Sequence, residues 1–360
     1  MSLSSIKSLI PLSLKKCLIP FLQPQNLILP EGRRNFIFLA ADYGNIGDLA
    51  ITAAQKNFLR IHSPGCELVA IPISVTRQLL RSIRRQITQH DLVTIIGGGN
   101  MGSLYPDIEE LRQLVIRTFP RNRIVCFPQT LDWDESVVSV RALREIVRTY
   151  SRHPDIYVFA RESITRDKLA ELFREHGNVT IGYVPDIVMS TTGAALGATS
   201  DAVPSGILRC LRDDRECVLD AVCYAQLDAA LVGTGQAITR TDTHAGGSQL
   251  DEAQCALLLA GKLEQFRAAR LVVTDRLHGM ILSVLAGTPC LVLPNANHKI
   301  RQTWLDWLQG HPLVAFLEPE HFDTLPEVLE RLLDSPRGNL QTLPLDTRYY
   351  ASLKKALLWR

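Results

Sequence analysis

Residues 36–61 read FIFLAADYGNIGDLAITAAQKNFLRI. The first five, Phe36–Ala40, are a short apolar run, and Asp42–Asp48 is a polar stretch with two glycines. From Asp48 to Ile61, apolar residues recur at three- and four-residue intervals. This order predicts a buried strand, a tight loop and an amphipathic helix, which together make the repeating unit of a parallel α/β sheet.

The same unit recurs through the first half of the chain. Five further apolar runs, rich in Ile, Val and Phe, have the composition of strands buried on both faces of a sheet. We therefore expect a Rossmann-like domain over residues 33–195, preceded by an N-terminal arm over residues 1–32. The expected strands after the first are 68–73, 92–96, 123–127, 156–159 and 179–183, and the expected helices after the first are 76–89, 108–118, 135–151 and 164–175.

A second alternating region follows residues 191–205, a stretch rich in Gly, Ala, Ser and Thr that is typical of a linker. We expect a second Rossmann-like domain over residues 205–325 and a C-terminal helical segment over residues 326–360. Two such domains form a cleft, and parallel sheets bind ligands at the carboxyl ends of their strands. The pattern predicts strands at 206–211, 271–274 and 290–293, helices near 216–231, 249–269, 279–286, 300–308, 326–333 and 347–359, and a loop at 234–247.

The composition excludes several classes of protein. With 360 residues, of which 46% are hydrophobic and 21% charged, the chain is globular and long enough for two domains. A formal net charge of +2 provides no overall basic field for nucleic acid. The eight cysteines are scattered without paired spacing, which predicts reduced thiols and neither a disulfide framework nor a zinc site.

The N-terminus carries an apolar segment, Ser8–Leu22, near Lys7, Lys15 and Lys16. The lysines and Pro11 interrupt it too early for a signal peptide, and no run approaches the roughly 20 apolar residues of a membrane-spanning helix. Two interpretations stay open: a helix packed on its own domain, or an amphipathic arm that touches an anionic membrane surface. We expect a cytoplasmic protein, either free or peripheral at the inner face of the membrane.

Polar loops follow the expected strands of the first domain. Glycines there allow the backbone to approach a ligand closely, and free N–H groups at a helix start favour an anion or a sugar hydroxyl. Each loop also has a purely structural interpretation, as a helix cap, a tight turn or a local ion pair. Arg161 offers a forked cation for a carboxylate or phosphate. The candidate substrate-binding residues in these loops are Asn45, Gly47, Asp48, Gly98, Gly99, Asn100, Gln129, Arg161, Glu162 and Asp186.

The strongest signal is LVVTDRLHGM at Leu271–Met280, which runs from a buried strand into the start of a helix. Arg276 and His278 stand at the positive end of that helix, so they can bind an anion and hand it a proton. These two residues are the catalytic candidates, and no metal site is expected. Further substrate-binding candidates at the same sheet edge are Asp275, Gly279, Asn295 and Lys299.

Six short motifs occur in order along the chain: GNIGD at 44–48, GGGN at 97–100, FPQ at 127–129, ARES at 160–163, PD at 185–186 and TDRLHG at 274–279. Together they resemble the polysaccharide pyruvyl transferases of bacterial exopolysaccharide and cell-wall assembly. The resemblance extends from about Asn35 to Trp307. It implies an α/β fold like that of the GT-B glycosyltransferases, in which two Rossmann-like domains face a cleft.

The resemblance also implies an activity. The family transfers the enolpyruvyl carbons of phosphoenolpyruvate onto two hydroxyls of one sugar, which makes a cyclic ketal and releases phosphate. Arg276 and Arg161 would hold the trianionic donor, His278 would be the general acid, and Asp186 or Asp48 would be the base. The acceptor would be a glycan, free or lipid-linked, and no cofactor besides the donor substrate would be required.

Two other functions stay open. A glycosyltransferase of the same architecture would use a nucleotide sugar, and it would need an acidic or glycine-rich donor site in the second domain, where Glu318 and Glu320 are the acidic residues at hand. A non-catalytic relative would bind glycans or scaffold an assembly complex. The presence of both Arg276 and His278 favours an enzyme over a scaffold.

Overall fold

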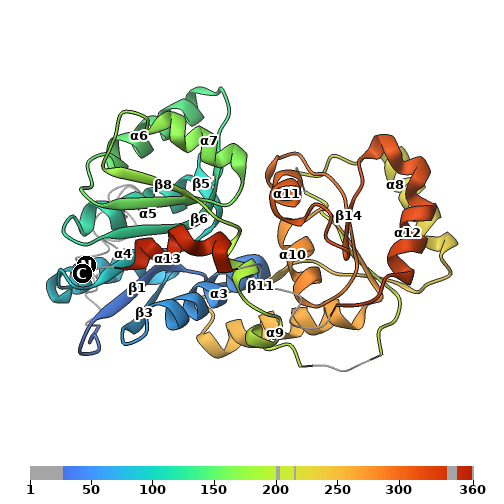
Figure 1. Ribbon diagram of the computed structural model, residues 1–360, viewed down its shortest axis with the longest axis horizontal. Helices are drawn as coiled ribbons and strands as arrows, with labels where there is room; N and C mark the ends of the chain where they lie inside the picture. Colours follow the sequence, from blue (N-terminus) through green and yellow to red (C-terminus); the bar gives the residue numbers. More distant parts are fainter. Residues whose placement is uncertain (1–26, 200–202, 215, 339–346, 359–360) are drawn as a thin grey trace, which may run out of the picture.

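The computed structural model describes residues 27–199, 203–214, 216–338 and 347–358, which form two α/β lobes (Figure 1). The first lobe is built on a seven-stranded parallel sheet, in which β5 (Gly98–Gly102) pairs with the end of β6. All of the strands and helices that the sequence predicted for this lobe are present. The strand order is β3 (Glu67–Pro72), β1 (Arg34–Ala40), β4 (Leu92–Ile95), β6 (Ile124–Asp132), β7 (Ile156–Ala160) and β8 (Val179–Tyr183).

The helices of this lobe cover both faces of the sheet. The chain moves in one direction from β1 to β3 and in the opposite direction from β3 through β4, β6 and β7 to β8. Because such crossovers are right-handed, α3 lies on one face and the other four helices lie on the opposite face. The helices are α3 (Ile46–His62), α4 (Ile73–Gln86), α5 (Pro106–Thr118), α6 (Val137–Tyr150) and α7 (Ser163–Leu172).

The second lobe is built on a five-stranded parallel sheet. Its strand order is β10 (Ile238–Arg240), β9 (Ile207–Cys210), β12 (Leu271–Thr274), β13 (Cys290–Val292) and β14 (Val314–Phe316). The helices are α8 (Ala221–Gly233), α9 (Glu252–Ala268), α10 (Leu277–Leu285), α11 (Lys299–Thr303), which continues as a π-helical turn (Trp304–Leu308), and α12 (Leu325–Asp334). The predicted fold class, two Rossmann-like α/β domains facing a cleft, is confirmed.

The prediction of a loop over residues 234–247 is wrong. This segment contains β10 and most of β11 (His244–Ser248), and β11 pairs antiparallel with β2 (Tyr43–Asn45) of the first lobe. The ribbon forms because Gly44 packs directly against the backbone of Gly246, where a side chain would not fit. Both strands are short and rich in glycine, so their sequences show no alternating apolar pattern. They form only where the two lobes meet.

The C-terminal part of the chain serves both lobes. α12 packs in the core of the second lobe, whereas α13 (Ala351–Leu357) lies across the first lobe (Figure 1). Just before α13, the buried hydroxyl of Tyr350 donates to the carbonyl of Asp186 at 2.8 Å. The described parts of the predicted segment 326–360 thus supply one α-helix to each lobe. Of the predicted N-terminal arm, residues 1–26 lie outside the described residues.

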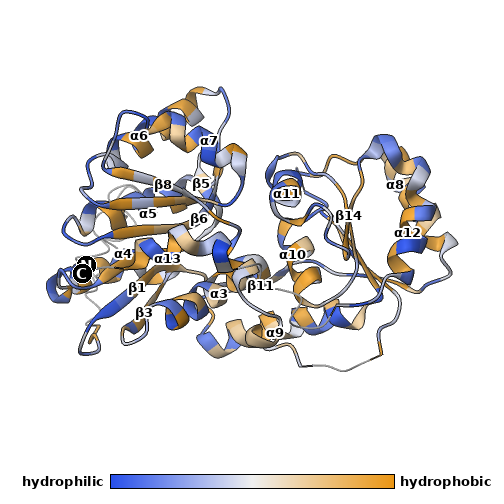
Figure 2. Cartoon of the chain, in the orientation of Figure 1, coloured by the Kyte–Doolittle hydropathy of each residue, from blue (hydrophilic) through white to orange (hydrophobic). Residues whose placement is uncertain are grey.

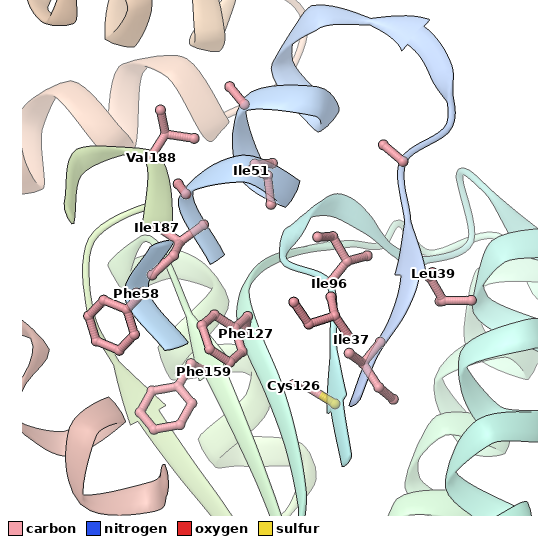
Figure 3. Packing of buried hydrophobic residues seen from close by; sticks show 14 of the residues in the cluster. Ile37, Leu39, Ile51, Phe58, Ile96, Cys126, Phe127, Phe159, Ile187 and Val188 are labelled. Carbon is pink, nitrogen blue, oxygen red and sulfur yellow. The ribbon is translucent and has the colours of Figure 1, made fainter. Parts of the chain in front are cut away.

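The buried apolar residues form one core cluster in each lobe and one of them extends across both. Figure 2 shows hydrophobic residues, in orange, along the strands and in stretches of the helices. In the first lobe, Phe58, Phe127 and Phe159 lie close to Ile187 and Val188 (Figure 3). This core holds the carboxyl ends of both sheets, which carry the polar loops, in fixed positions.

Among the described residues, no helix is long and apolar enough to cross a membrane.

Candidate active site

A cavity of about 350 Å³ lies between the lobes, at the carboxyl ends of both sheets. Loops of the first lobe form one wall, and the start of α10, the start of α11 and the ribbon strand β11 contribute to the other. The lining residues are Tyr43, Asn45, Asp48, Gly99, Asn100, Tyr105, Ile108, Arg161, Arg212, Thr243, His244, Arg276, Leu277, His278 and Lys299. The cavity thus lies at the edge of both sheets at which the sequence rule placed the ligand, the carboxyl ends of the strands.

The imidazole of His278 is held between residues of the first lobe. Its Nε2 lies 3.5 Å from Oδ2 of Asp186, which is in ion-pair range, and this nitrogen is enclosed. On the other side the ring rests against Gly47, where any side chain would collide with Nδ1. Gly47 and His278 stand in the first turns of α3 and α10, so these two helix starts face each other.

Asp186 is buried behind His278 and is fully engaged. Its Oδ2 also accepts from Nη1 of Arg161 at 2.7 Å, and its Oδ1 accepts from the backbone N–H of Val188 at 2.9 Å. Burial alone would raise the pKa of this carboxyl, but the contact with His278 and the charge of Arg161 outweigh it and hold the pKa well below its usual range. Asp186 is therefore an ionised anchor for the guanidinium of Arg161 and the imidazole of His278.

Arg161 links this anchor to both lobes. Only 1% of the residue is exposed, and its Nε donates to Oγ1 of Thr130 at 2.8 Å. Its backbone carbonyl accepts from Nε1 of Trp307, in the second lobe, at 2.7 Å. The guanidinium forms part of the cavity wall, and Nη2 lies so close to Gly99 that a Cβ there would stand 2.9 Å away. Glycine at this position leaves the room that the guanidinium occupies.

Three further cations come from the second lobe. Nη2 of Arg276 lies 2.9 Å from Asp242, and its buried Nε has no hydrogen-bond partner among the described residues. Arg212 and Lys299 both reach Glu216, at 2.6 and 3.3 Å. Burial lowers the pKa of Lys299 and the neighbouring arginines lower it further, although Glu216 opposes them. Each cation of the second-lobe wall is thus held by an acidic partner from the same lobe.

The polar residues of the first-lobe wall are ordered by local hydrogen bonds. Asn45 caps α3, since its Oδ1 accepts from the N–H groups of Gly47 and Asp48 at 3.0 and 3.4 Å. Asp48 accepts from the hydroxyl of Tyr43 at 2.8 Å. Burial raises the pKa of Tyr43, so its hydroxyl stays protonated and donates. The buried Arg112 of α5 donates to the backbone carbonyl and to Oδ1 of Asn100, and Asn100 also lines the cavity.

Several predicted site residues lie behind the cavity wall instead of on it. Gln129 ties β6 to the carbonyl of Ile96, and Glu162 accepts from two threonine hydroxyls. Asp275 accepts from the backbone N–H of Arg212 at 3.0 Å, and burial raises its pKa to about 6. The residues with such supporting positions are Gly47, Gly98, Gln129, Glu162, Asp186, Asp275, Gly279 and Asn295.

The structure adds lining residues that the sequence interpretation missed. Arg212 follows β9 by two residues, so the rule that polar groups after strands form sites could have found it. Thr243 and His244 belong to the segment that was predicted as a loop, and no motif or strand end in the sequence marks them as cavity residues. Tyr43, Tyr105, Ile108 and Leu277 complete the set of missed residues.

The sequence matches the profile of the family described as polysaccharide pyruvyl transferase over residues 45–230 and 256–297. The chain belongs to this family. General stress protein 30 of Bacillus subtilis is 30% identical to it over 328 residues, which are 89% of this chain and 91% of that protein. Pyruvyl transferase 1 of Schizosaccharomyces pombe is 29% identical over 285 residues, which are 75% of this chain and 68% of that protein.

Solved structures support the fold of this family member. A functionally uncharacterised protein from Klebsiella pneumoniae, 17% identical, superposes with a TM-score of 0.52 over 88% of this chain and 99% of that chain. The UDP-GlcNAc 2-epimerase of Methanocaldococcus jannaschii, 12% identical, has a TM-score of 0.50 over 90% of this chain and 99% of that chain. These likenesses confirm the GT-B-like arrangement, and the family makes the protein a transferase.

Proposed function

We propose that this protein transfers the pyruvyl group of phosphoenolpyruvate onto two hydroxyls of one sugar in a polysaccharide or its lipid-linked precursor. The C2 carbon of the donor loses its π bond to C3 and its bond to the phosphate oxygen, and it gains two bonds to sugar oxygens. Of the two hydroxyl protons, one converts the methylene carbon into a methyl group and the other leaves with the phosphate. The reaction balances with no cofactor beyond the donor.

One observation carries this proposal: basic side chains from both lobes converge on one small cavity. Arg161, Arg212, Arg276, His278 and Lys299 line it, and Asp48 is the one carboxylate among the described lining residues. A trianion with a phosphate and a carboxylate suits such a set, because arginine forks bind both groups in a bidentate manner.

Ion pairs hold the second-lobe cations in place before the donor binds. The side chains of Asp214 and Asp242, which pair with Arg212 and Arg276, are 44% and 43% exposed. These carboxylates are the exposed partners of their pairs and can turn to solvent, whereas Glu216, whose side chain is 13% exposed, keeps its contacts with Arg212 and Lys299. The donor would then take over the arginine forks.

We assign the general acid to His278. Because its Nε2 is enclosed and faces Asp186, the nitrogen that can exchange a proton with a bound donor is Nδ1, on the side of Gly47. The ionised Asp186 stabilises the imidazolium and fixes its orientation, as a buried carboxylate does for a catalytic histidine elsewhere. Asp186 is a positioning residue in this scheme.

We assign the base for the acceptor hydroxyl to Asp48. The two oxygens of Asp186 are taken by Arg161, His278 and Val188. Asp48 lines the cavity, and within the described part of the chain its side chain accepts only from the Tyr43 hydroxyl, on Oδ2. Its position at the edge of the first-lobe wall leaves Oδ1 for a sugar hydroxyl. The sugar would therefore enter from the side of the first lobe.

The test separates donor binding from turnover. Phosphoenolpyruvate should raise the melting temperature of the protein and nucleotide sugars should not, because a ligand that binds only the folded state stabilises it. Arg276→Ala should lose this stabilisation. His278→Ala should keep it but lose phosphate release in the presence of a panel of sugars. Stabilisation by a nucleotide sugar and not by phosphoenolpyruvate would assign the protein to the glycosyltransferases and overturn the proposal.

A further inference from the structure

Arginines are concentrated on the outer surface of α4, α5 and α6. These helices lie on one face of the first sheet, where α4 packs beside α5 and α5 beside α6 (Figure 1). α4 contains four arginines and no acidic residue, although the net charge of the whole chain is only +2. We call the following exposed residues the arginine face: Arg81, Arg84, Arg85, Arg117, Arg141, Arg144, Arg148 and Arg152.

The arginine face includes a groove of about 610 Å³ between α5 and α6. Arg117, Arg141, Arg148 and Arg152 line it together with Glu109, Glu110 and Glu145. Glu109 is paired with Arg112, and Glu110 is paired with Arg77 at 2.9 Å. Among the described residues, Arg141 and Arg152 have no ion pair, and Arg117 donates to the neutral side chains of Gln113 and Thr149. Only Arg148 is neutralised, by Glu145 on the same helix. The groove is therefore ready to take an anionic group.

Exposed apolar side chains border this surface at the end nearest the catalytic cavity. Val137 and Val138, in the first turn of α6, are 85% and 69% exposed. A hydrogen bond of 3.2 Å between Ser103 and Ser139 joins this turn to the segment before α5. That segment ends at Tyr105, which is 45% exposed and lines the catalytic cavity. The apolar edge and the cavity mouth are thus neighbours.

The described part of the chain also begins at this surface. The carbonyl of Leu27 accepts from Nε2 of Gln86, the last residue of α4, at 2.8 Å. The preceding 26 residues, which include Lys7, Lys15 and Lys16, therefore join the protein next to Arg84 and Arg85.

We propose that the arginine face docks the protein onto an anionic membrane surface. The groove between α5 and α6 receives lipid headgroup phosphates, and Val137 and Val138 enter the boundary between headgroups and acyl chains. Basic residues with bordering apolar side chains are the combination that such a surface selects. The phosphates of a nucleic acid would also bind the arginines, but the exposed valines would make no favourable contact with them. Docking in this orientation brings the cavity mouth near the bilayer.

Vesicle flotation with the full-length protein tests the proposal without any assay of turnover. Binding to phosphatidylcholine vesicles should be weak, should rise when phosphatidylglycerol replaces part of the lipid, and should fall with added salt. The variant Arg141→Gln/Arg144→Gln/Arg152→Gln should bind the anionic vesicles more weakly by a factor on the order of 100. Val137→Ser/Val138→Ser should also weaken binding, and this loss should persist at high salt.

The matched control removes three exposed arginines outside the arginine face, as Arg174→Gln/Arg240→Gln/Arg331→Gln. It should bind within a few-fold of the wild type. Equal losses in both triple variants would overturn the proposal, as would unchanged binding of the first. Loss of binding only in Lys7→Gln/Lys15→Gln/Lys16→Gln would place the contact in the N-terminal arm instead. Binding to duplex DNA with no binding to anionic vesicles would also overturn it.

Discussion

Replacement of Gly47 by alanine should impair catalysis far more than folding. A Cβ at this position would lie 2.7 Å from Cγ of His278 and closer still to Nδ1, whereas ordinary van der Waals contact begins at 3.4 Å. The imidazole must therefore withdraw by at least 0.7 Å, the difference between 3.4 and 2.7 Å. The movement falls on the side chain to which we assign the proton transfer.

The surroundings of His278 give the ring no free path. Asp186 lies at 3.5 Å on the far side and is itself held by Arg161 and Val188. A misplacement of about 1 Å in a reacting group costs about 100-fold in rate, so kcat of Gly47→Ala should fall by about that factor. The backbone of α3 should tolerate the change, because alanine is favoured over glycine inside a helix by about 0.5–1 kcal/mol.

The assay is phosphate release from phosphoenolpyruvate with the acceptor found in the sugar panel, alongside calorimetric binding of the donor and thermal unfolding. The matched control is Gly261→Ala in α9, where an added Cβ would meet nothing within 4 Å. The control should keep full activity and gain some stability. If Gly47→Ala turns over at the wild-type rate, the placement of His278 between Gly47 and Asp186 does not govern the reaction.

Three further predictions concern the supporting residues. Burial raises the pKa of Asp275 from 3.8 to about 6, so its ionisation in the folded state costs up to about 3 kcal/mol at pH values above both pKa values, and this cost vanishes below both. Asp275→Asn should therefore unfold at a higher temperature than the wild type at alkaline pH and at the same temperature at about pH 2, below both pKa values; a difference that is independent of pH would contradict this reasoning. Asp186→Asn should lower the free energy of unfolding by about 3 kcal/mol in denaturant titrations, because the buried Arg161 keeps only the longer ion pair with Glu162 at 3.8 Å, and it should lower kcat as well; wild-type stability and wild-type kcat would show that the pair with Asp186 is dispensable. Tyr350→Phe removes a buried hydroxyl that donates to the carbonyl of Asp186 and should cost about 1 kcal/mol of stability with little change in kcat, whereas a large loss of activity would mean that α13 positions the site.

The sequence was sufficient to predict the elements of both sheets that carry apolar runs. β1, β6 and β12 are buried along their whole lengths apart from the last residue of β6, and continuous apolar strands leave a signal that needs no knowledge of the partner strand. The rule that ligands bind at strand ends then led to Arg161, Arg276 and His278. All three side chains line the cavity.

The same rule failed where a residue's role depends on a neighbour from a distant segment. Gln129 and Glu162 follow strands as cavity residues do, but their side chains turn inward to satisfy buried groups of adjacent loops. Arg212 and His244 reach the cavity because the second lobe folds against the first. Nothing in the local pattern separates a polar side chain that ties down a loop from one that faces a ligand.

The sequence alone determined the α/β class, the order of most strands and helices, and the sheet edge at which the polar loops gather. These features follow from local periodicity, since each residue's burial is set by its own element. Only the tertiary structure decided the β2–β11 ribbon, the return of α13 to the first lobe and the meeting of His278 with Asp186. Those contacts join segments tens to hundreds of residues apart, and their energies depend on how two finished surfaces fit, which no local pattern records.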